Sequence, residues 1–144
     1  MLAAALLGAW GSADAPTVYA SLSRPNWAPP AWVFGPVWSA LYLLLAAAAA
    51  WAAQEPSSPQ QRRGLTTLAV LLLPLALWSW CFFAWRSSAL SLACILMLDG
   101  LVLATLLQLW PVRRGAALLL APLLAWVLFA SALNLELVLR NPGL

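Results

Sequence analysis

AWVFGPVWSALYLLLAAAAAWAA, residues Ala31–Ala53, is an uncharged run of 23 residues that decides the fold of this chain. A helix rises about 1.5 Å per residue, so roughly 20 apolar residues cross the hydrocarbon of a bilayer. The run shows none of the apolar–polar alternation of a membrane β-strand. Because only helices and closed barrels satisfy their backbone polar groups in lipid, the run is predicted to be a transmembrane helix.

Four further apolar runs flank this stretch and are predicted to be helices too. The first is interrupted by Asp14 and Pro16, and its start resembles a signal-peptide core without the positively charged end, so a short transmembrane helix is expected. Short loops make neighbouring helices antiparallel. We therefore predict an all-α membrane protein, a five-transmembrane-helix bundle that forms a single domain over residues 1–144. The predicted helices are about 1–18, 31–53, 65–85, 88–109 and 116–139.

The overall composition supports this fold class. Of the 144 residues, 65% are hydrophobic and 8% are charged, against about 25% charged in an ordinary soluble domain. This excludes a soluble globular domain and a disordered chain. The arginines are scattered over the loops without a basic cluster, so no nucleic-acid partner is expected. Alanine- and arginine-rich usage without lysine is typical of GC-rich DNA, so we expect an integral, multi-pass protein of a bacterial cell membrane.

Absent and rare residue types narrow the possible chemistry. The chain has neither histidine nor lysine, which excludes an imidazole metal site, a histidine general base and a lysine Schiff base. Cys81 and Cys94 lie in apolar runs without C-x-x-C spacing, so they are predicted to be buried hydrophobic side chains rather than a disulfide or metal site. We predict no metal site and no required cofactor.

Ten tryptophans exceed what anchoring at the two membrane interfaces requires. Phe34, Trp38 and Tyr42 are four residues apart, so they share one helix face, which either packs against other helices or lines a site. Two further stripes are Trp78, Phe82 and Trp85 in one predicted helix, and Trp126, Ala130 and Asn134 in another. If the stripes converge, they form a flat-walled apolar pocket that suits a large planar ligand.

Two polar side chains fall inside predicted spans. Asp99 lies in the middle of the fourth run, where an acid costs about 2.5–3.5 kcal/mol on insertion scales. It is either functional or a structural polar contact between helices or subunits. Asn134 needs a hydrogen-bond partner, which either a neighbouring helix or a ligand would supply.

The first loop and second helix resemble the TspO/MBR family, which comprises tryptophan-rich sensory proteins and translocator proteins. The family pattern reads here as Tyr19, Leu22, Arg24-Pro25-Asn26-Trp27-Ala28-Pro29-Pro30, Trp32, Phe34, Trp38 and Tyr42. Matches in the third and fifth helices are Trp78, Phe82, Phe83, Pro122, Trp126, Leu133 and Asn134. Leu75 replaces a family Asn, and Leu123 replaces a family Tyr. The resemblance covers about residues 19–141.

The resemblance implies a five-helix bundle, usually a homodimer, with a pocket open toward the first loop. Members bind porphyrins, notably protoporphyrin IX, and some bacterial members degrade it in light. That degradation depends on two tryptophans whose motif positions match Trp38 and Trp126. The ligand-binding residues expected here are Tyr19, Arg24, Trp27, Phe34, Trp38, Tyr42, Trp78, Phe82, Trp126, Ala130 and Asn134.

Two function classes remain open. The first is a porphyrin-binding protein in tetrapyrrole or oxidative-stress sensing or regulation, in which Trp38 and Trp126 donate electrons to the excited ligand. The second is a small transporter of porphyrin, lipid or sterol, with Asp99 as its proton-coupled residue. Arg24 either pairs with the porphyrin propionates or is a solvated loop residue.

Overall fold

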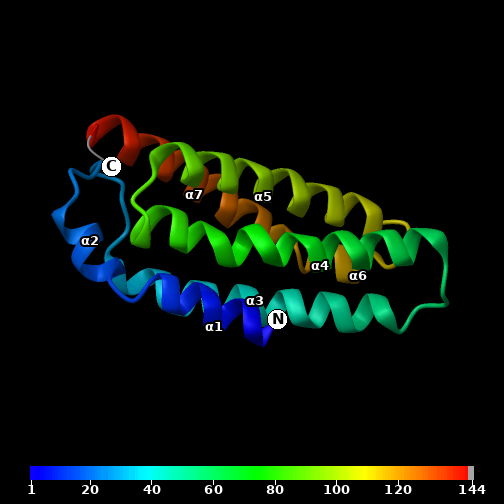
Figure 1. Ribbon diagram of the computed structural model, residues 1–144. Coiled ribbons are helices and arrows are strands. Elements are labelled where there is room, and N and C mark those ends of the chain that lie inside the picture. The colour runs from blue at the N-terminus through cyan, green and yellow to red at the C-terminus, as the bar shows by residue number, and fades with distance from the viewer. Residues whose placement is uncertain (143–144) are drawn as a thin grey trace.

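The computed structural model describes residues 1–142, which form an elongated helical bundle (Figure 1). The elements are α1 (Leu2–Gly11), α2 (Ala15–Ser21), the 3-10 turn η1 (Ala31–Val33), α3 (Phe34–Ala53), α4 (Pro59–Ser79), the π-helical turn η2 (Trp80–Ala84), α5 (Ser88–Leu109), α6 (Arg114–Leu118) and α7 (Ala121–Arg140). Among the described residues, no β-strand is present. The all-helical fold class is therefore confirmed.

Four segments are long and apolar enough to cross a membrane: Ala31–Ala53, Pro59–Ala84, Ser88–Leu109 and Arg114–Arg140. The predicted count of five spanning helices is not confirmed. The predicted helix 1–18 is divided between α1 and α2, and the 10 residues of α1 reach only about 15 Å. The chain turns between Gly11 and Ala15, and Pro16 lies in the first turn of α2, where its missing N–H costs no hydrogen bond.

Two other helices differ in their bounds from the prediction. α4 begins at Pro59 instead of Leu65, because Ser58 caps it: the Ser58 Oγ accepts from the Gln61 N–H at 3.1 Å. The predicted helix 116–139 is divided into α6 and α7 by a turn that precedes Pro122. As at Pro16, a proline that could have sat inside a helix instead lies in its first turn.

Close packing holds the bundle together. α4 lies along α5, and α5 lies along α7 (Figure 1). The buried core between these helices and α3 is made largely of leucine, valine and alanine, including Leu45, Ala48, Leu71, Leu98, Val102, Leu123 and Val127. Lipid is as apolar as these side chains, so helix association there depends on close contact and on hydrogen bonds. At Gly115, for example, a Cβ would lie 2.7 Å from the Trp51 ring.

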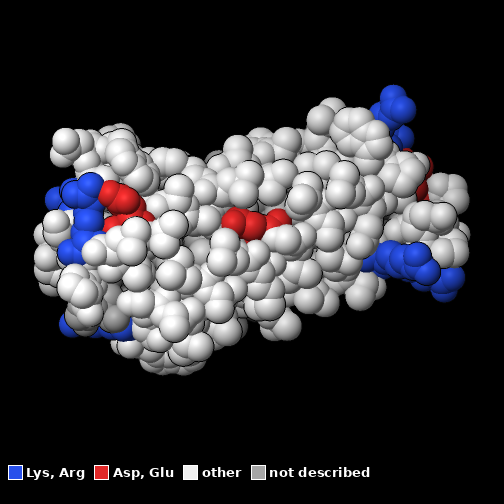
Figure 2. Space-filling view, turned by 90° about the horizontal axis from the view of Figure 1, so that it is seen from above, with Lys and Arg blue, Asp and Glu red and all other residues white. Residues whose placement is uncertain are grey.

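Charged side chains gather at the two ends of the bundle, and an acidic group lies midway along the face drawn in Figure 2. At one end Arg113 pairs with Glu55 at 2.8 Å, and at the other Arg140 pairs with Glu136 at 2.6 Å. In the middle of α5, Asp99 accepts a hydrogen bond from the Ser131 Oγ of α7 at 2.7 Å. An apolar surface between two charged ends is the pattern expected of a membrane-spanning bundle.

Candidate ligand-binding site

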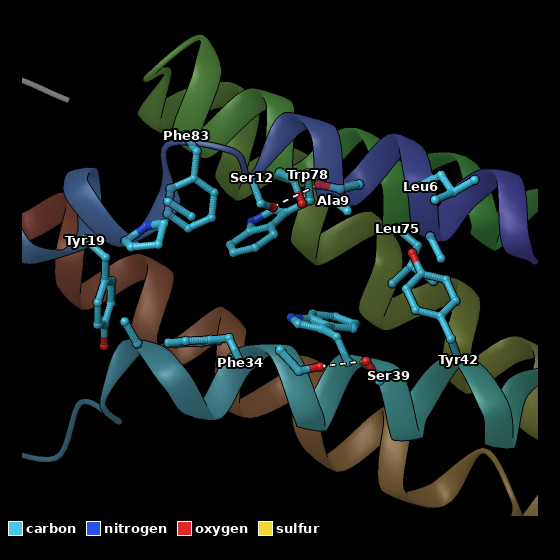
Figure 3. A pocket seen from close by; sticks show the side chains of 18 of the residues that line it. Leu6, Ala9, Ser12, Tyr19, Phe34, Ser39, Tyr42, Leu75, Trp78 and Phe83 are labelled. Atoms are coloured by element: carbon cyan, nitrogen blue, oxygen red, sulfur yellow. Dashed lines mark hydrogen bonds between the residues drawn. The ribbon is translucent and has the colours of Figure 1, made fainter.

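A cavity of about 610 Å³ lies between α1, α3 and α4, next to the first loop (Figure 3). Small-molecule sites occupy about 300–1,000 Å³. The lining residues are Ala5, Leu6, Gly8, Ala9, Ser12, Ala15, Pro16 and Tyr19 from α1, α2 and the turn between them; Ala31, Trp32, Phe34, Gly35, Trp38, Ser39 and Tyr42 from η1 and α3; and Leu75, Trp78, Ser79 and Phe83 from α4 and η2. Most of this surface is apolar, so the cavity suits a hydrophobic ligand.

Aromatic rings lie on two opposite sides of the cavity. Phe34, Trp38 and Tyr42 all reach it from one face of α3, as their spacing predicts. Figure 3 shows Tyr42 rising from α3 and Phe34 lying along it, with Trp78 and Phe83 on the opposite side of the cavity. A flat ligand between the two sides would meet aromatic rings on both of its faces, which favours stacking and edge contacts.

Apart from Leu6, the α1 side of the cavity is made of small residues. Ala5, Gly8, Ala9 and Ser12 share one helix face and leave the space that the cavity occupies. The Ser12 Oγ donates to the Gly8 carbonyl at 2.9 Å (Figure 3). Its hydrogen is therefore already used, and the serine presents a lone pair rather than a donor to a ligand.

A close approach to η2 holds α1 in place. A Cβ on Gly11 would lie 2.7 Å from the Trp80 ring, so only glycine allows this approach. The Trp80 Nε1 then donates to the Leu7 carbonyl at 3.0 Å. α1 is thus fixed against the end of α4 and leaves the space toward α3 open.

Hydrogen bonds hold the first loop over one end of the cavity. The Tyr19 hydroxyl donates to the Pro29 carbonyl at 2.9 Å, which closes the loop on itself. Asn141, at the end of α7, accepts from the Ser23 N–H at 2.9 Å and donates to the Ser23 carbonyl at 3.0 Å. Burial raises the pKa of Tyr19 above its ordinary value, and the charge of the nearby Arg24 opposes this only in part. Tyr19 therefore remains a neutral donor at physiological pH.

Five of the predicted ligand-binding residues line the cavity: Tyr19, Phe34, Trp38, Tyr42 and Trp78. Arg24 and Trp27 lie on the first loop. The Arg24 Cζ is 4.9 Å from the centroid of the Tyr19 ring, which places its charge next to a lining residue. Trp27 is not among the residues that line the cavity, and its ring contacts Phe129 of α7, with centroids 5.8 Å apart.

The remaining predicted residues lie behind the cavity walls. Phe82 stacks on Trp78 with centroids 5.5 Å apart. Trp126 lies behind the α3 side, and its centroid is 6.4 Å from that of Trp38. Ala130 and Asn134 are buried in the bundle, where the Asn134 Nδ2 donates to the Ser91 Oγ of α5 at 3.4 Å. This is the interhelical hydrogen bond that the sequence left open as an alternative.

The sequence pattern of the TspO/MBR family matches residues 1–140. The chain belongs to the TspO/MBR family. It is 35% identical over 125 residues to the tryptophan-rich protein TspO of Chlorobaculum tepidum, an alignment that covers 86% of this chain and 79% of that relative. It is 33% identical over 144 residues to protein CrtK of Rhodobacter capsulatus, covering 99% and 90%. It is 35% identical over 126 residues to the human translocator protein, covering 81% and 70%.

Family membership and the four apolar spans show that this is a multi-pass membrane protein. Its bacterial relatives agree with the predicted bacterial membrane. Within residues 1–142, no three Cys, Asp or Glu side chains gather as they would around a metal ion.

Sequence reasoning missed several lining residues of this TspO/MBR member. Trp32 and Phe83 match family motif positions and line the cavity, but they were not among the predicted ligand contacts. Leu75, which replaces a family Asn, also lines it, so the cavity lacks an amide there. The small residues of α1 were missed entirely. Their spacing at i, i+3, i+4 and i+7 from Ala5 to Ser12 was the available signal.

Proposed function

We propose that this protein binds protoporphyrin IX or a related tetrapyrrole in the cavity and acts in tetrapyrrole or oxidative-stress sensing or regulation. The observation that carries the proposal is the cavity itself, which has aromatic rings on two opposite sides and an apolar lining. A planar macrocycle makes the largest contact area with such walls. The porphyrin is ligand or substrate, and no other cofactor is required.

Light-dependent breakdown of the porphyrin is the activity that these side chains support. Tryptophan is the most readily oxidised of the common aromatic side chains, and Trp38 lines the cavity. Its indole is placed to give one electron to a bound, light-excited porphyrin. Trp126 lies in edge contact with Trp38 at 90° between the ring planes, so it takes part through Trp38.

Polar contacts to the porphyrin propionates come from the end of the cavity near the first loop. Arg24 is exposed there beside Tyr19 and supplies the counter-charge.

Titration of protoporphyrin IX into the detergent-purified protein tests this proposal. We expect saturable quenching of tryptophan emission, followed by loss of porphyrin absorbance in light and none in darkness. The variant that combines Trp38→Phe with Trp126→Phe should bind the porphyrin but not consume it. Absence of saturable quenching would exclude the porphyrin site. Loss of porphyrin absorbance at the parent rate in the double variant would show that the two indoles do not carry the breakdown.

A small transporter of porphyrin, lipid or sterol is the second candidate, favoured by one observation. Asp99 lies midway along α5, and its buried Oδ1 has no partner among the described residues, although Oδ2 accepts from Ser131. An acid at bilayer depth often marks a transport path. Under this reading, Asp99→Asn abolishes flux into vesicles while porphyrin binding persists.

We also propose the arrangement that the family resemblance implies, a five-helix bundle that forms a homodimer. In this arrangement α1 and α2 together form the first of five membrane helices, and the homodimer is in contact with membrane lipid. The packing of α1 against α4 supports the first part. Light scattering of the detergent-purified protein, which reports the protein mass apart from the detergent, tests the second.

A further inference from the structure

A chain of aromatic rings connects the cavity to the protein surface. Trp38 lines the cavity and contacts Trp126, with ring centroids 6.4 Å apart. Trp126 contacts Phe129 at 5.4 Å, and Phe129 contacts Trp27 at 5.8 Å. Trp27 is 50% exposed. We call these four residues the Trp38–Trp27 chain.

The rings on the α4 side of the cavity lack such an exit. Trp78 contacts Phe82 at 5.5 Å and Phe83 at 5.8 Å, and these two phenylalanines contact each other at 4.9 Å. Phe82 is buried, and this cluster contains no second tryptophan. Of the two clusters, only the Trp38–Trp27 chain has an indole at the cavity, an indole at the surface and ring contacts between them.

We propose that the Trp38–Trp27 chain is an electron relay that supplies Trp38 from the surface. This inference rests on the proposed function, because it assigns an electron source to the indole that reduces the excited porphyrin. It also explains how Trp126 can matter although it is not among the residues that line the cavity. Phe129 is harder to oxidise than an indole and acts as the bridge between Trp126 and Trp27.

Electrons move in one direction along the Trp38–Trp27 chain, from Trp27 to the porphyrin. Trp38 gives one electron to the light-excited porphyrin, Trp126 gives one to oxidised Trp38, and Trp27 gives one to oxidised Trp126. The reduced porphyrin passes its extra electron to dioxygen, which forms superoxide and regenerates the porphyrin. In the breakdown of the proposed function, this superoxide is the oxidant of the macrocycle. Trp27 releases its N–H proton to water, then regains one electron and one proton from a low-molecular-weight thiol. Two thiyl radicals join into a disulfide, so two thiols and two dioxygens give one disulfide, two superoxides and two protons.

The relay increases the yield of the first step. An oxidised Trp38 that stays beside the reduced porphyrin takes its electron back, and no net reaction follows. When oxidation passes from Trp38 to Trp27, the oxidised indole is separated from the reduced porphyrin. It then lies at the surface, where a soluble thiol can reach it. The protein's own thiols, Cys81 and Cys94, are buried and so cannot replace that external reductant.

A test without porphyrin separates this inference from the proposed function. Ser39 is exposed beside Trp38, and both native cysteines are buried, so Ser39→Cys can be labelled selectively with a ruthenium polypyridyl. A light flash with an irreversible cobalt(III) acceptor then oxidises the label, which takes an electron from Trp38. Peptide mass spectrometry locates stable indole oxidation products, and electron paramagnetic resonance detects the tryptophan radical.

We expect oxidation to concentrate at Trp27 in the labelled Ser39→Cys protein and to decrease when a thiol is added. Adding Trp126→Phe, or separately Phe129→Leu, should lower the yield of oxidation products at Trp27 to the yield at Trp85. Trp85 is the reference because it is exposed and its ring contacts are outside the Trp38–Trp27 chain. Trp85→Phe is the matched control and should leave the yield at Trp27 unchanged. Unchanged Trp27 oxidation in Trp126→Phe, or none above the Trp85 level in the labelled parent, would overturn the relay. A working relay in a protein that fails to bind protoporphyrin IX would refute only the proposed function.

Discussion

The α3 side and the α1 side of the cavity differ in the size of the side chains that line them. The α3 side comes from a long uncharged helix that presents Phe34, Trp38 and Tyr42. The α1 side comes from the 10 residues of α1 and the turn after it, which present alanine, glycine and serine beside a single leucine, Leu6. Large rings on one side provide contact area and oxidisable groups. Small residues on the other side provide the space. The comparison indicates that changes on the α3 side alter chemistry, whereas changes on the α1 side alter whether a ligand fits.

The largest expected effect is on the α3 side. Trp38→Phe should abolish light-dependent porphyrin loss, because phenylalanine does not donate an electron as indole does. Ring contacts are worth about 0.5–1.5 kcal/mol, so the porphyrin Kd should rise by no more than about tenfold. Absorbance decay under illumination measures the first quantity and emission quenching the second. Trp85→Phe is the control, and breakdown at the parent rate in Trp38→Phe would contradict the account.

On the α1 side, a change outside the cavity lining should weaken binding through packing. Gly11→Ala places a Cβ 2.7 Å from the Trp80 ring, and such overpacking costs about 1–3 kcal/mol. α1 should shift, which lowers both the thermal midpoint in detergent and the porphyrin affinity. Gly100→Ala is the matched control, because nothing lies within 4 Å of its Cβ. Equal behaviour of the two variants would show that α1 is not held through Gly11.

The first loop joins the two sides and should give a smaller, pH-dependent effect. Burial raises the pKa of Tyr19 above 10.0, so its hydrogen bond to Pro29 is fully present below about pH 10 and is lost as pH rises through the raised value. Tyr19→Phe should cost about 1 kcal/mol of stability at neutral pH. It should also remove the part of the alkaline loss of stability that Tyr19 causes. Unfolding midpoints from pH 8 to pH 11 measure both effects, and identical curves for parent and variant would refute this role.

The smallest expected effect is at Asp99, which lies on neither side of the cavity. Asp99→Asn keeps an acceptor for the Ser131 hydroxyl, so porphyrin binding and breakdown should stay at parent levels. A loss of flux in vesicles with intact binding would instead favour the transporter. Quenching, illumination and uptake on the same preparations distinguish these outcomes.

The same two sides show what the sequence could predict. The run from Ala31 to Ala53 was predicted with the bounds that the structure gives, and its stripe of rings follows from helical spacing alone. These are local properties. The division at Asp14 and Pro16 was not predicted, because a proline can kink a continuing helix or begin a new one, and only packing decides between them.

The site was harder to predict than the fold. The contact that fixes α1, between Gly11 and Trp80, joins residues far apart in the chain and leaves no local signal. The rotation of α7 is also set by packing: it places Trp126 behind Trp38 and turns Asn134 toward Ser91. A motif identifies such residues as belonging to a site but does not say which of them touch the ligand.

The most direct test of the account fills the cavity from its small-residue side. Ala9 lines the cavity on α1, whereas Ala93 is an exposed alanine on the outer face of α5. Titration of protoporphyrin IX into Ala9→Trp should show no saturable binding, and Ala93→Trp should bind as the parent does. Parent-like affinity in Ala9→Trp would contradict the claim that this cavity holds the porphyrin.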